Sequence, residues 1–184
     1  MRQEFDRAGR FNEFRIEPIT SVNACVNFDC EVPEYNDYLF RDALRSVNDH
    51  VAFTWLLTEL STEKTAAYMS LIMDAIKLSG AEKELHHLNY PFRTIPAMKI
   101  AKLAVDSNFS KKYKGIGTFM IRNAKKFALF CNSAYCAARF LTVDADIEHD
   151  KGVLTFYEKN DFIPNAELYN KNRKTISMRK DLYK

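Results

Sequence analysis

Two of the five glycines in this 184-residue chain lie two positions apart, at Gly115 and Gly117, and this pair constrains the fold more than any other feature. It separates a β-type segment from a long pattern of apolar residues at three- and four-residue steps, which is typical of a helix. Glycines at a helix N-terminus let consecutive backbone N–H groups converge on one point, where the helix dipole adds about half a positive charge. The sequence therefore predicts an anion-binding loop at this position.

Basic residues cluster around the glycine pair, although the net charge of the chain is only +3. Residues 97–130 contain eight lysines and arginines against one acid, whereas residues 144–161 lean acidic. A cluster of one sign favours a phosphate-bearing ligand, because a solvated helix surface usually mixes signs. The alternative is a lysine-rich surface helix. The eight basic residues within 97–130 are Lys99, Lys102, Lys111, Lys112, Lys114, Arg122, Lys125 and Lys126.

Hydrophobic periodicity predicts alternating strands and helices within one α+β domain that spans residues 1–184. Hydrophobic residues make up 47% and charged residues 28% of the chain, which excludes a disordered protein. We expect a mixed central sheet of about six to seven strands flanked by about four helices, with a polar insertion at about 80–96 before the fourth strand. Strands are expected at 14–19, 51–60, 65–78, 97–105, 140–145, 162–163 and 175–182, helices from Pro33 and over 115–131 and 149–159, and a loop over 107–114.

No apolar run approaches the roughly 18 residues that a membrane span needs, and the first ten residues are charged throughout. We therefore expect neither a transmembrane helix nor a signal peptide, and a cytoplasmic protein. The cysteines form two equal spacings, Cys25-x4-Cys30 and Cys131-x4-Cys136. Their apolar neighbours favour buried free thiols over a zinc site, and the scattered histidines lead us to assign no metal.

The glycine pair does not match the common nucleotide-binding loops. The phosphate-binding loop of nucleotide hydrolases needs four residues between its glycines and then Lys-Ser/Thr, and neither is present. The dinucleotide fingerprint G-x-G-x-x-G lacks its third glycine, because position 120 is methionine. Both nucleotide interpretations fail on spacing.

Three segments resemble motifs of the GNAT superfamily of N-acetyltransferases. Lys112–Gly117 is similar to the family's Q/R-x-x-G-x-G/A motif, which holds the pyrophosphate of acetyl-CoA. Leu103–Asp106 resembles the L-A-V-D of the family's fourth strand, and Phe156–Phe162 resembles its F-Y-E-K-x-G-F segment. Since all three occur in the family's order, the resemblance implies a single GNAT-like domain.

A finer resemblance is to the acetyltransferase toxins of bacterial toxin–antitoxin pairs. Phe28–Leu39 resembles their F-x-C-G…L-x-x-Y-L opening, and Tyr90–Lys99 resembles their proline-bearing approach to the fourth strand. The chain departs from the pattern with Lys102 for Arg, Lys112 for Gln/Arg, Glu31 and Asp161 for Gly, and Asp150 for the Asn near the pantetheine. Because aspartate tolerates the left-handed backbone better than most residues, we expect the turn at Asp161 to be kept.

The resemblance implies acetyl transfer from acetyl-CoA to a primary amine by direct attack, with Tyr157 as the general acid for the CoA thiolate. The alternative for Tyr157 is an ordinary amphipathic position on its helix. Main-chain groups at Leu103, Ala104 and Val105 would orient the thioester. The remaining cofactor-binding residues implied are Lys111, Lys112, Tyr113, Lys114, Gly115, Ile116, Gly117 and Thr118.

The toxin-like segments make the α-amine of aminoacyl-tRNA one candidate acceptor, and small amines and protein N-termini are equally permitted. Basic residues beyond the loop would contact tRNA phosphates. An antitoxin protein and a second copy of the chain, forming a homodimer, are candidate partners, and a membrane is not. A non-catalytic acyl-CoA-binding or partner-binding module on the same scaffold is the alternative function. The basic residues that would contact tRNA phosphates are Arg122, Lys125, Lys126, Lys171, Arg173 and Lys174.

Overall fold

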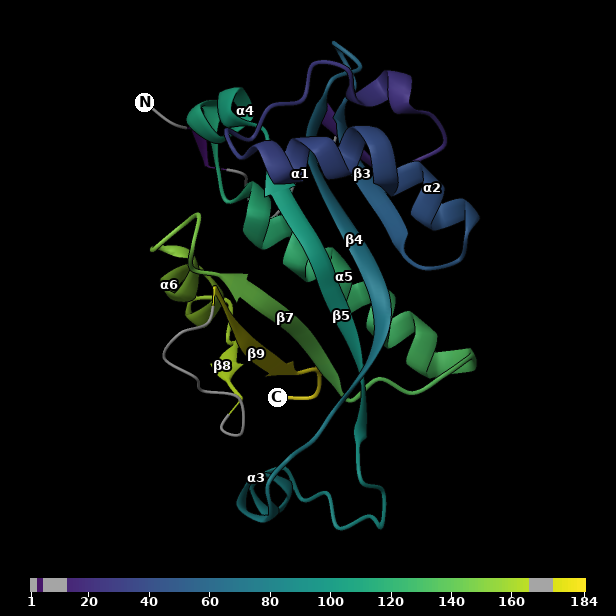
Figure 1. Ribbon diagram of the computed structural model, residues 1–184, viewed down its shortest axis with the longest axis vertical. Helices are drawn as coiled ribbons and strands as arrows, with labels where there is room; N and C mark the ends of the chain where they lie inside the picture. Colours follow the sequence, from purple (N-terminus) through teal and green to yellow (C-terminus); the bar gives the residue numbers. More distant parts are fainter. Residues whose placement is uncertain (1–2, 5–12, 166–173) are drawn as a thin grey trace. The chain divides into compact units, whose positions relative to one another are not determined.

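The computed structural model describes residues 3–4, 13–165 and 174–184 (Figure 1). The chain groups into two compact units, of which unit 1 comprises residues 1–72 and 101–123 and unit 2 comprises residues 73–100 and 124–184. The single domain over residues 1–184 remains a prediction. Among the described residues, no helix combines the length and apolar character that crossing a bilayer requires.

The strands form a seven-stranded mixed sheet, which confirms the predicted mixed sheet of about six to seven strands. The strand order is β2-β3-β4-β5-β7-β9-β8. Strand β5 is parallel to β7, whereas β2–β3, β3–β4, β7–β9 and β8–β9 are antiparallel. Taken as continuous segments, the α-helices among the described residues number five, one more than the expected four. The strands are β2 (Phe14–Pro18), β3 (Phe53–Glu59), β4 (Thr65–Ile76), β5 (Ile95–Val105), β7 (Phe140–Asp146), β8 (Ile163–Pro164) and β9 (Thr175–Asp181).

In unit 1, a continuous helix begins at Pro33, as predicted, and runs through α1 (Pro33–Asp37), a π-helical turn (Tyr38–Asp42) and α2 (Ala43–Asn48). It follows a short 3-10 helix (Val22–Cys25) and crosses one face of β3 and β4 (Figure 1). Its apolar stripe packs on a buried cluster that includes Phe28, Leu39, Tyr68 and Ala104. This cluster connects the helix to β4 and to the end of β5.

The predicted loop over residues 107–114 is wrong over its whole length. Ser107–Lys112 is a helix, α4, and Tyr113–Lys114 is a short strand, β6, that pairs in parallel with β1 (Gln3–Glu4). The carboxylate of Asp106 accepts hydrogen bonds from the N–H groups of Asn108 (2.9 Å) and Phe109 (3.2 Å) and so caps the new helix. Phe109 is buried beneath it. An aspartate followed by a buried aromatic residue three positions later was the available signal.

In unit 2, the insertion at 80–96 is a folded part of the core. Helix α3 (Gly80–Leu85) begins with a capping box between Ser79 and Glu82, and Figure 1 shows it beyond the ends of β4 and β5. Leu88 and Ile95 then pack with Ile76, Leu78, Ala97 and Phe140 in a buried cluster.

Helix α6 (Val153–Glu158) is shorter than the predicted helix over 149–159. The chain turns before it because the carboxylate of Asp150 accepts the N–H of Gly152 at 2.7 Å. At its end, Asp161 has a φ of 65°, so the expected left-handed turn is confirmed. The N–H of Phe162 donates to the carbonyl of Tyr157 at 3.1 Å, and that of Asp161 to Glu158 at 3.0 Å. This pattern closes the helix in the manner of a Schellman motif.

All four cysteines are free, but they are not all buried. Cys25 is buried in the core of unit 1, and burial raises the pKa of its thiol. Cys136 is exposed, and Cys30 and Cys131 are half-buried. The prediction of burial is therefore right for Cys25 and wrong for Cys136, because α5 (Ile116–Ala134) ends just before Cys136 and its flanking residues 133–137 face solvent.

A buried polar cluster fixes the insertion to the last strand of unit 2. Nδ1 of His86 lies 2.8 Å from a carboxylate oxygen of Asp181, which also accepts from Arg139 at 2.7 Å. Burial lowers the pKa of His86, and Asp181 opposes this shift only in part. Arg179, which pairs with Glu82, and Lys184 add positive charge around the ring and favour its neutral form.

We expect this cluster to make stability depend on pH. Because the folded state binds a proton at His86 less tightly than the unfolded state, the free energy of unfolding should fall by about 1 kcal/mol as the pH drops from 7 to 5. Replacing His86 by Asn, whose amide can still donate to Asp181, should remove this part of the slope. Urea unfolding at both pH values measures it, with the exposed neighbour His87→Asn as control; an unchanged slope in His86→Asn would contradict the assignment.

Candidate functional site

The N-terminus of α5 in unit 1 is the position at which the sequence predicts an anion-binding loop. Gly115 lies immediately before the helix, is exposed and has a φ of 97°, a conformation that side chains with a Cβ disfavour. Its carbonyl accepts the N–H of Phe119 at 2.9 Å, so the helical ladder begins there. The N–H groups of the first turn, including those of Ile116, Gly117 and Thr118, have no acceptor within an α-helix. They lie at the positive end of a 19-residue helix.

The lysines before this helix differ in their partners. Lys111 pairs with Glu31 at 3.0 Å, and Lys112 pairs with Glu59 at 3.1 Å. Lys112 also lies 4.8 Å from the ring centroid of Tyr113, and Tyr113 and Glu59 together raise its pKa. For Lys114 no ion pair occurs within the described residues. The local excess of positive charge in the sequence is thus partly balanced by acids from distant segments.

Leu103, Ala104 and Val105 are the last three residues of strand β5, directly before Asp106 and α4. Within the described residues, its ladder with β7 joins Ala97–Ile100 to Phe140–Val143. The ladder therefore ends three residues before Leu103. Ala104 is buried, whereas Leu103 and Val105 are half-buried. Main-chain groups of this segment are consequently outside the ladder with β7.

Asp106, the last residue of the L-A-V-D segment, organises the loops of unit 1. Only 2% of its surface is exposed, and its second carboxylate oxygen accepts the N–H of Asp29 at 3.0 Å. Its own N–H donates to the carbonyl of Ala66 at 2.9 Å, and the N–H of Ser107 donates to the carbonyl of Asp29 at 2.8 Å. One side chain therefore connects the end of β5, the start of α4 and the segment around Asp29.

The opening motif at Phe28–Leu39 folds against this same aspartate. The carboxylate of Asp29 accepts the N–H of Glu31 and the amide of Asn36, both at 2.8 Å, and these bonds hold the pKa of Asp29 below its usual range. Glu31, which replaces the family's glycine, has a left-handed φ of 66°. Asn36 also accepts the N–H of Cys30 at 3.1 Å. The two sequence motifs thus meet in one hydrogen-bonded network.

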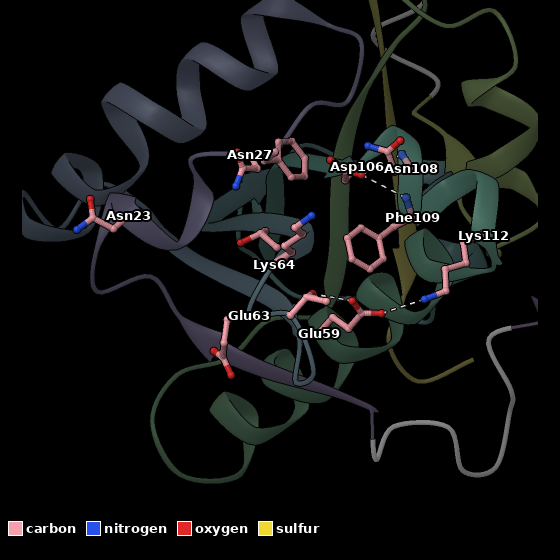
Figure 2. A pocket seen from close by; sticks show the side chains of 12 residues that line it. Asn23, Asn27, Glu59, Glu63, Lys64, Asp106, Asn108, Phe109 and Lys112 are labelled. Atoms are coloured by element: carbon pink, nitrogen blue, oxygen red, sulfur yellow. Dashed lines mark hydrogen bonds and ion pairs between the residues drawn. The ribbon is translucent and has the colours of Figure 1, made fainter.

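A pocket of about 310 Å³ lies beside α4 in unit 1 (Figure 2). The carboxylate of Glu59 accepts hydrogen bonds from the hydroxyl of Thr62 at 2.6 Å and from Nζ of Lys112 at 3.1 Å. Figure 2 shows Lys112 reaching toward Glu59. Burial would raise the pKa of Glu59, but Thr62 and Lys112 outweigh it and hold that pKa below its ordinary value. Lys112 therefore lines this pocket. No sequence motif indicated Glu59, because it lies more than fifty residues from its partner.

Tyr157 lies in unit 2, on α6, and 5% of its surface is exposed. Its ring contacts those of Phe156 and Phe162, with centroid distances of 5.0 and 5.3 Å. The left-handed turn at Asp161 brings Phe162 back onto the tyrosine. The carboxylate of Asp150 accepts the N–H of Gly152 and so takes part in the turn before α6.

One group of side chains in unit 2 has the chemistry of a cation site. Ligand atoms of Asp146, Glu148 and His149 lie within 4.8 Å of one another. However, Nδ1 of His149 is 2.8 Å from Asp146, and Lys174 pairs with Glu148 at 2.8 Å. The group is therefore already engaged by a histidine and a lysine, and we assign no metal to it.

The structure places all predicted cofactor-loop residues in unit 1 and Tyr157 in unit 2. Within unit 1, Leu103–Val105 and Gly115–Thr118 are joined by α4 and β6, and Lys111 and Lys112 turn toward carboxylates. Sequence reasoning missed Glu59, Asp106 and Glu31 as partners. Only the capping pattern at Asp106 gave a local signal.

No protein-family profile and no curated protein sequence matches this chain. Solved structures do. A tyrosine-to-phenylalanine variant of KacT aligns with a TM-score of 0.73 and 16% identity over 91% of this chain and 95% of its own. AtaT complexed with acetyl-methionyl-tRNAfMet aligns at 0.70 and 19%, over 89% and 93%. A variant of the toxin AtaT bound to the C-terminus of the antitoxin AtaR and acetyl-CoA aligns at 0.68 and 19%, over 91% and 93%.

At these identities the likeness establishes the fold. It confirms the predicted GNAT-like α+β architecture, with a seven-stranded mixed sheet, over most of the chain.

The left-handed conformation of Gly115 generates a prediction about stability. Gly115→Ala should lower the free energy of unfolding by about 1 kcal/mol or more, because a Cβ is disfavoured at this φ. Gly80→Ala is the matched control, since a Cβ there meets nothing within 4 Å and alanine favours the helix. Urea unfolding of both variants measures the difference. Equal changes in the free energy of unfolding would contradict the prediction, because they would show that an alanine side chain at position 115 causes no backbone strain.

Proposed function

We propose that this chain is a cytoplasmic, acetyl-CoA-dependent N-acetyltransferase. One observation carries the proposal: a left-handed Gly115 opens a 19-residue helix directly after the L-A-V-D strand, in a chain with the fold of KacT and AtaT. This arrangement fits a pyrophosphate, since a helix N-terminus with adjacent glycines presents several N–H donors to one anion.

The residues of unit 1 divide the binding of acetyl-CoA between them. The N–H groups of Gly115–Thr118 would hold the pyrophosphate, and Lys114 would add a positive charge. Lys111, Lys112 and Tyr113 complete the proposed loop, with both lysine side chains anchored by carboxylates. Main-chain groups of Leu103, Ala104 and Val105 would orient the thioester, because their segment lies outside the ladder with β7.

Acetyl-CoA supplies an activated acetyl group whose transfer to an amine leaves a thiolate that needs a proton. We assign that proton to the hydroxyl of Tyr157. The contacts of Tyr157 with Phe156 and Phe162 support the assignment, because they hold the ring in one position and thereby fix the place of its hydroxyl. A phenol with an ordinary pKa of about 10 can donate to a thiolate of somewhat lower basicity.

We propose the α-amine of aminoacyl-tRNA as the acceptor. The toxin-like segments and the structure of AtaT with acetyl-methionyl-tRNAfMet support this choice. Arg122 and Lys126 are exposed on α5, whereas Lys174 pairs with Glu148. Lys171 and Arg173 lie outside the described residues. Small amines and protein N-termini are the alternative acceptors, and an antitoxin is a proposed partner on the precedent of AtaR.

A mass-spectrometric screen of acetyl transfer to amines, peptides and charged tRNAs tests the activity. Tyr157→Phe keeps the buried ring but loses the hydroxyl, so it should lower the transfer rate by about tenfold or more and leave acetyl-CoA binding intact. Tyr135→Phe, which removes a hydroxyl from a side chain that is 75% exposed, is the matched control and should act as wild type.

Two results would contradict this proposal in different ways. Equal turnover by Tyr157→Phe would move the acid role to another residue. Acetyl-CoA binding without transfer to any acceptor in the screen would favour a non-catalytic acyl-CoA-binding module on the same fold.

The RNA acceptor makes a separate prediction about salt. Phosphate contacts from lysine and arginine release counterions, so the affinity for tRNA should fall by about tenfold or more between 50 and 200 mM salt. A filter-binding series with one charged tRNA measures this. Affinity that does not change across the series would exclude the tRNA acceptor and leave the small-amine alternative.

A further inference from the structure

One lysine of unit 1 is held by aromatic rings instead of a carboxylate. Nζ of Lys102, on β5, lies 4.5 Å from the ring centroid of Tyr35 and 5.9 Å from that of Tyr38, both on the helix that begins at Pro33. An ammonium over a ring face is attracted by the ring quadrupole. This attraction positions the ammonium but leaves its full charge in place.

The surroundings of Lys102 differ from those of its neighbours in sequence. Lys99, Lys111 and Lys112 each pair with a carboxylate, at distances of 2.6 to 3.1 Å. In the part of the chain that the structure describes, no carboxylate pairs with Lys102. Lys102 is also half-buried. A half-buried cation without an anion is a site at which an anionic ligand gains more than at a fully hydrated lysine.

Buried Tyr68 contacts both Tyr35 and Tyr38 and holds them in place. The ring of Tyr38 stacks on that of buried Tyr68, with 6.1 Å between centroids and 24° between planes. The hydroxyl of Tyr68 donates to the carbonyl of Tyr35 at 2.8 Å, and burial raises the pKa of Tyr68, which keeps this donor protonated. The ammonium of Lys102 is therefore held on a preorganised support.

The position of Lys102 along β5 relates it to the proposed reaction. Side chains alternate along a strand, so Lys102 and Ala104 lie on one face and Leu103 on the other. Ala104 packs in the cluster under the helix together with Leu39 and Tyr68. The ammonium thus lies on the helix-covered face. The Cα atom of Lys102 is about 7 Å along the strand from that of Ala104, the residue at the centre of the proposed thioester-orienting segment.

We propose that Lys102, supported by Tyr35 and Tyr38, binds a phosphodiester of the single-stranded 3′ end of the RNA acceptor. This inference rests on the proposed function and adds the residue that positions the acceptor. A lysine beside aromatic rings is the combination that binds single-stranded nucleic acid, because the cation takes the phosphate and the rings flank the base. A ligand that carried only a carboxylate would contact the ammonium but not the rings.

Fluorescence anisotropy with a labelled tRNA tests the contact without requiring turnover. Lys102→Met should weaken binding about tenfold and reduce the slope of log affinity against log salt by about one. Lys102→Arg, which keeps the charge, should stay within about threefold of wild type. Arg45→Met is the matched charge-removal control, because Arg45 is exposed and pairs with Asp49, and it should bind as wild type.

A tRNA trimmed of its single-stranded 3′ end provides the second arm. Wild type and Lys102→Met should bind this RNA equally. An unchanged affinity and slope of Lys102→Met for intact tRNA, or an equal loss for the trimmed RNA, would overturn the proposal. A higher KM of the variant for acidic peptide acceptors alone would overturn it in favour of a carboxylate site.

Kinetics separate this proposal from the proposed function. Lys102→Met should raise the KM for charged tRNA and leave the KM for acetyl-CoA unchanged. Absence of acetyl transfer by the wild type, with Lys102-dependent RNA binding retained, would refute the transferase assignment and support the RNA contact.

Discussion

The carboxylate of Asp106 is the interaction on which unit 1 depends. One oxygen caps α4 through Asn108 and Phe109, and the other accepts the N–H of Asp29. A buried carboxylate is costly unless its oxygens are satisfied, and here backbone N–H groups satisfy both. Removing this side chain would therefore release the end of β5, the start of α4 and the Asp29 segment together. Only β6 and Gly115 separate α4 from α5, so the position of the N-terminus of α5 depends on the same contact.

Distant carboxylates decide which lysines remain available to a ligand. Glu31 and Glu59, far from the loop in sequence, take Lys111 and Lys112. Lys102 rests on tyrosine rings, which hold it without cancelling its charge. Of the five lysines from Lys99 to Lys114, Lys102 and Lys114 are thereby left without a carboxylate partner within the described residues.

Most elements could be predicted because their signals are local. The helix from Pro33, the β3–β4 hairpin and α5 follow from periodicity and from proline and glycine positions. The failures have local causes too. Ser107–Lys112 is polar and lysine-rich, and only the cap at Asp106 and the burial of Phe109 make it helical. Residues 149–152 are drawn into a turn by Asp146 and Asp150, so α6 starts later than its apolar pattern indicates.

Local features of the sequence predict the fold class, the start of the long helix α5 at the glycine pair and the turn at Asp161. These depend on glycine spacing, apolar period and backbone preference, which act over a few residues. Tertiary contacts set the partner of each lysine, the burial of each cysteine and the hydrogen bond between Asp29 and Asp106. Such contacts join residues that are tens of positions apart, and whether a charge is neutralised, stacked or left for a ligand depends on the side chain that folding brings beside it.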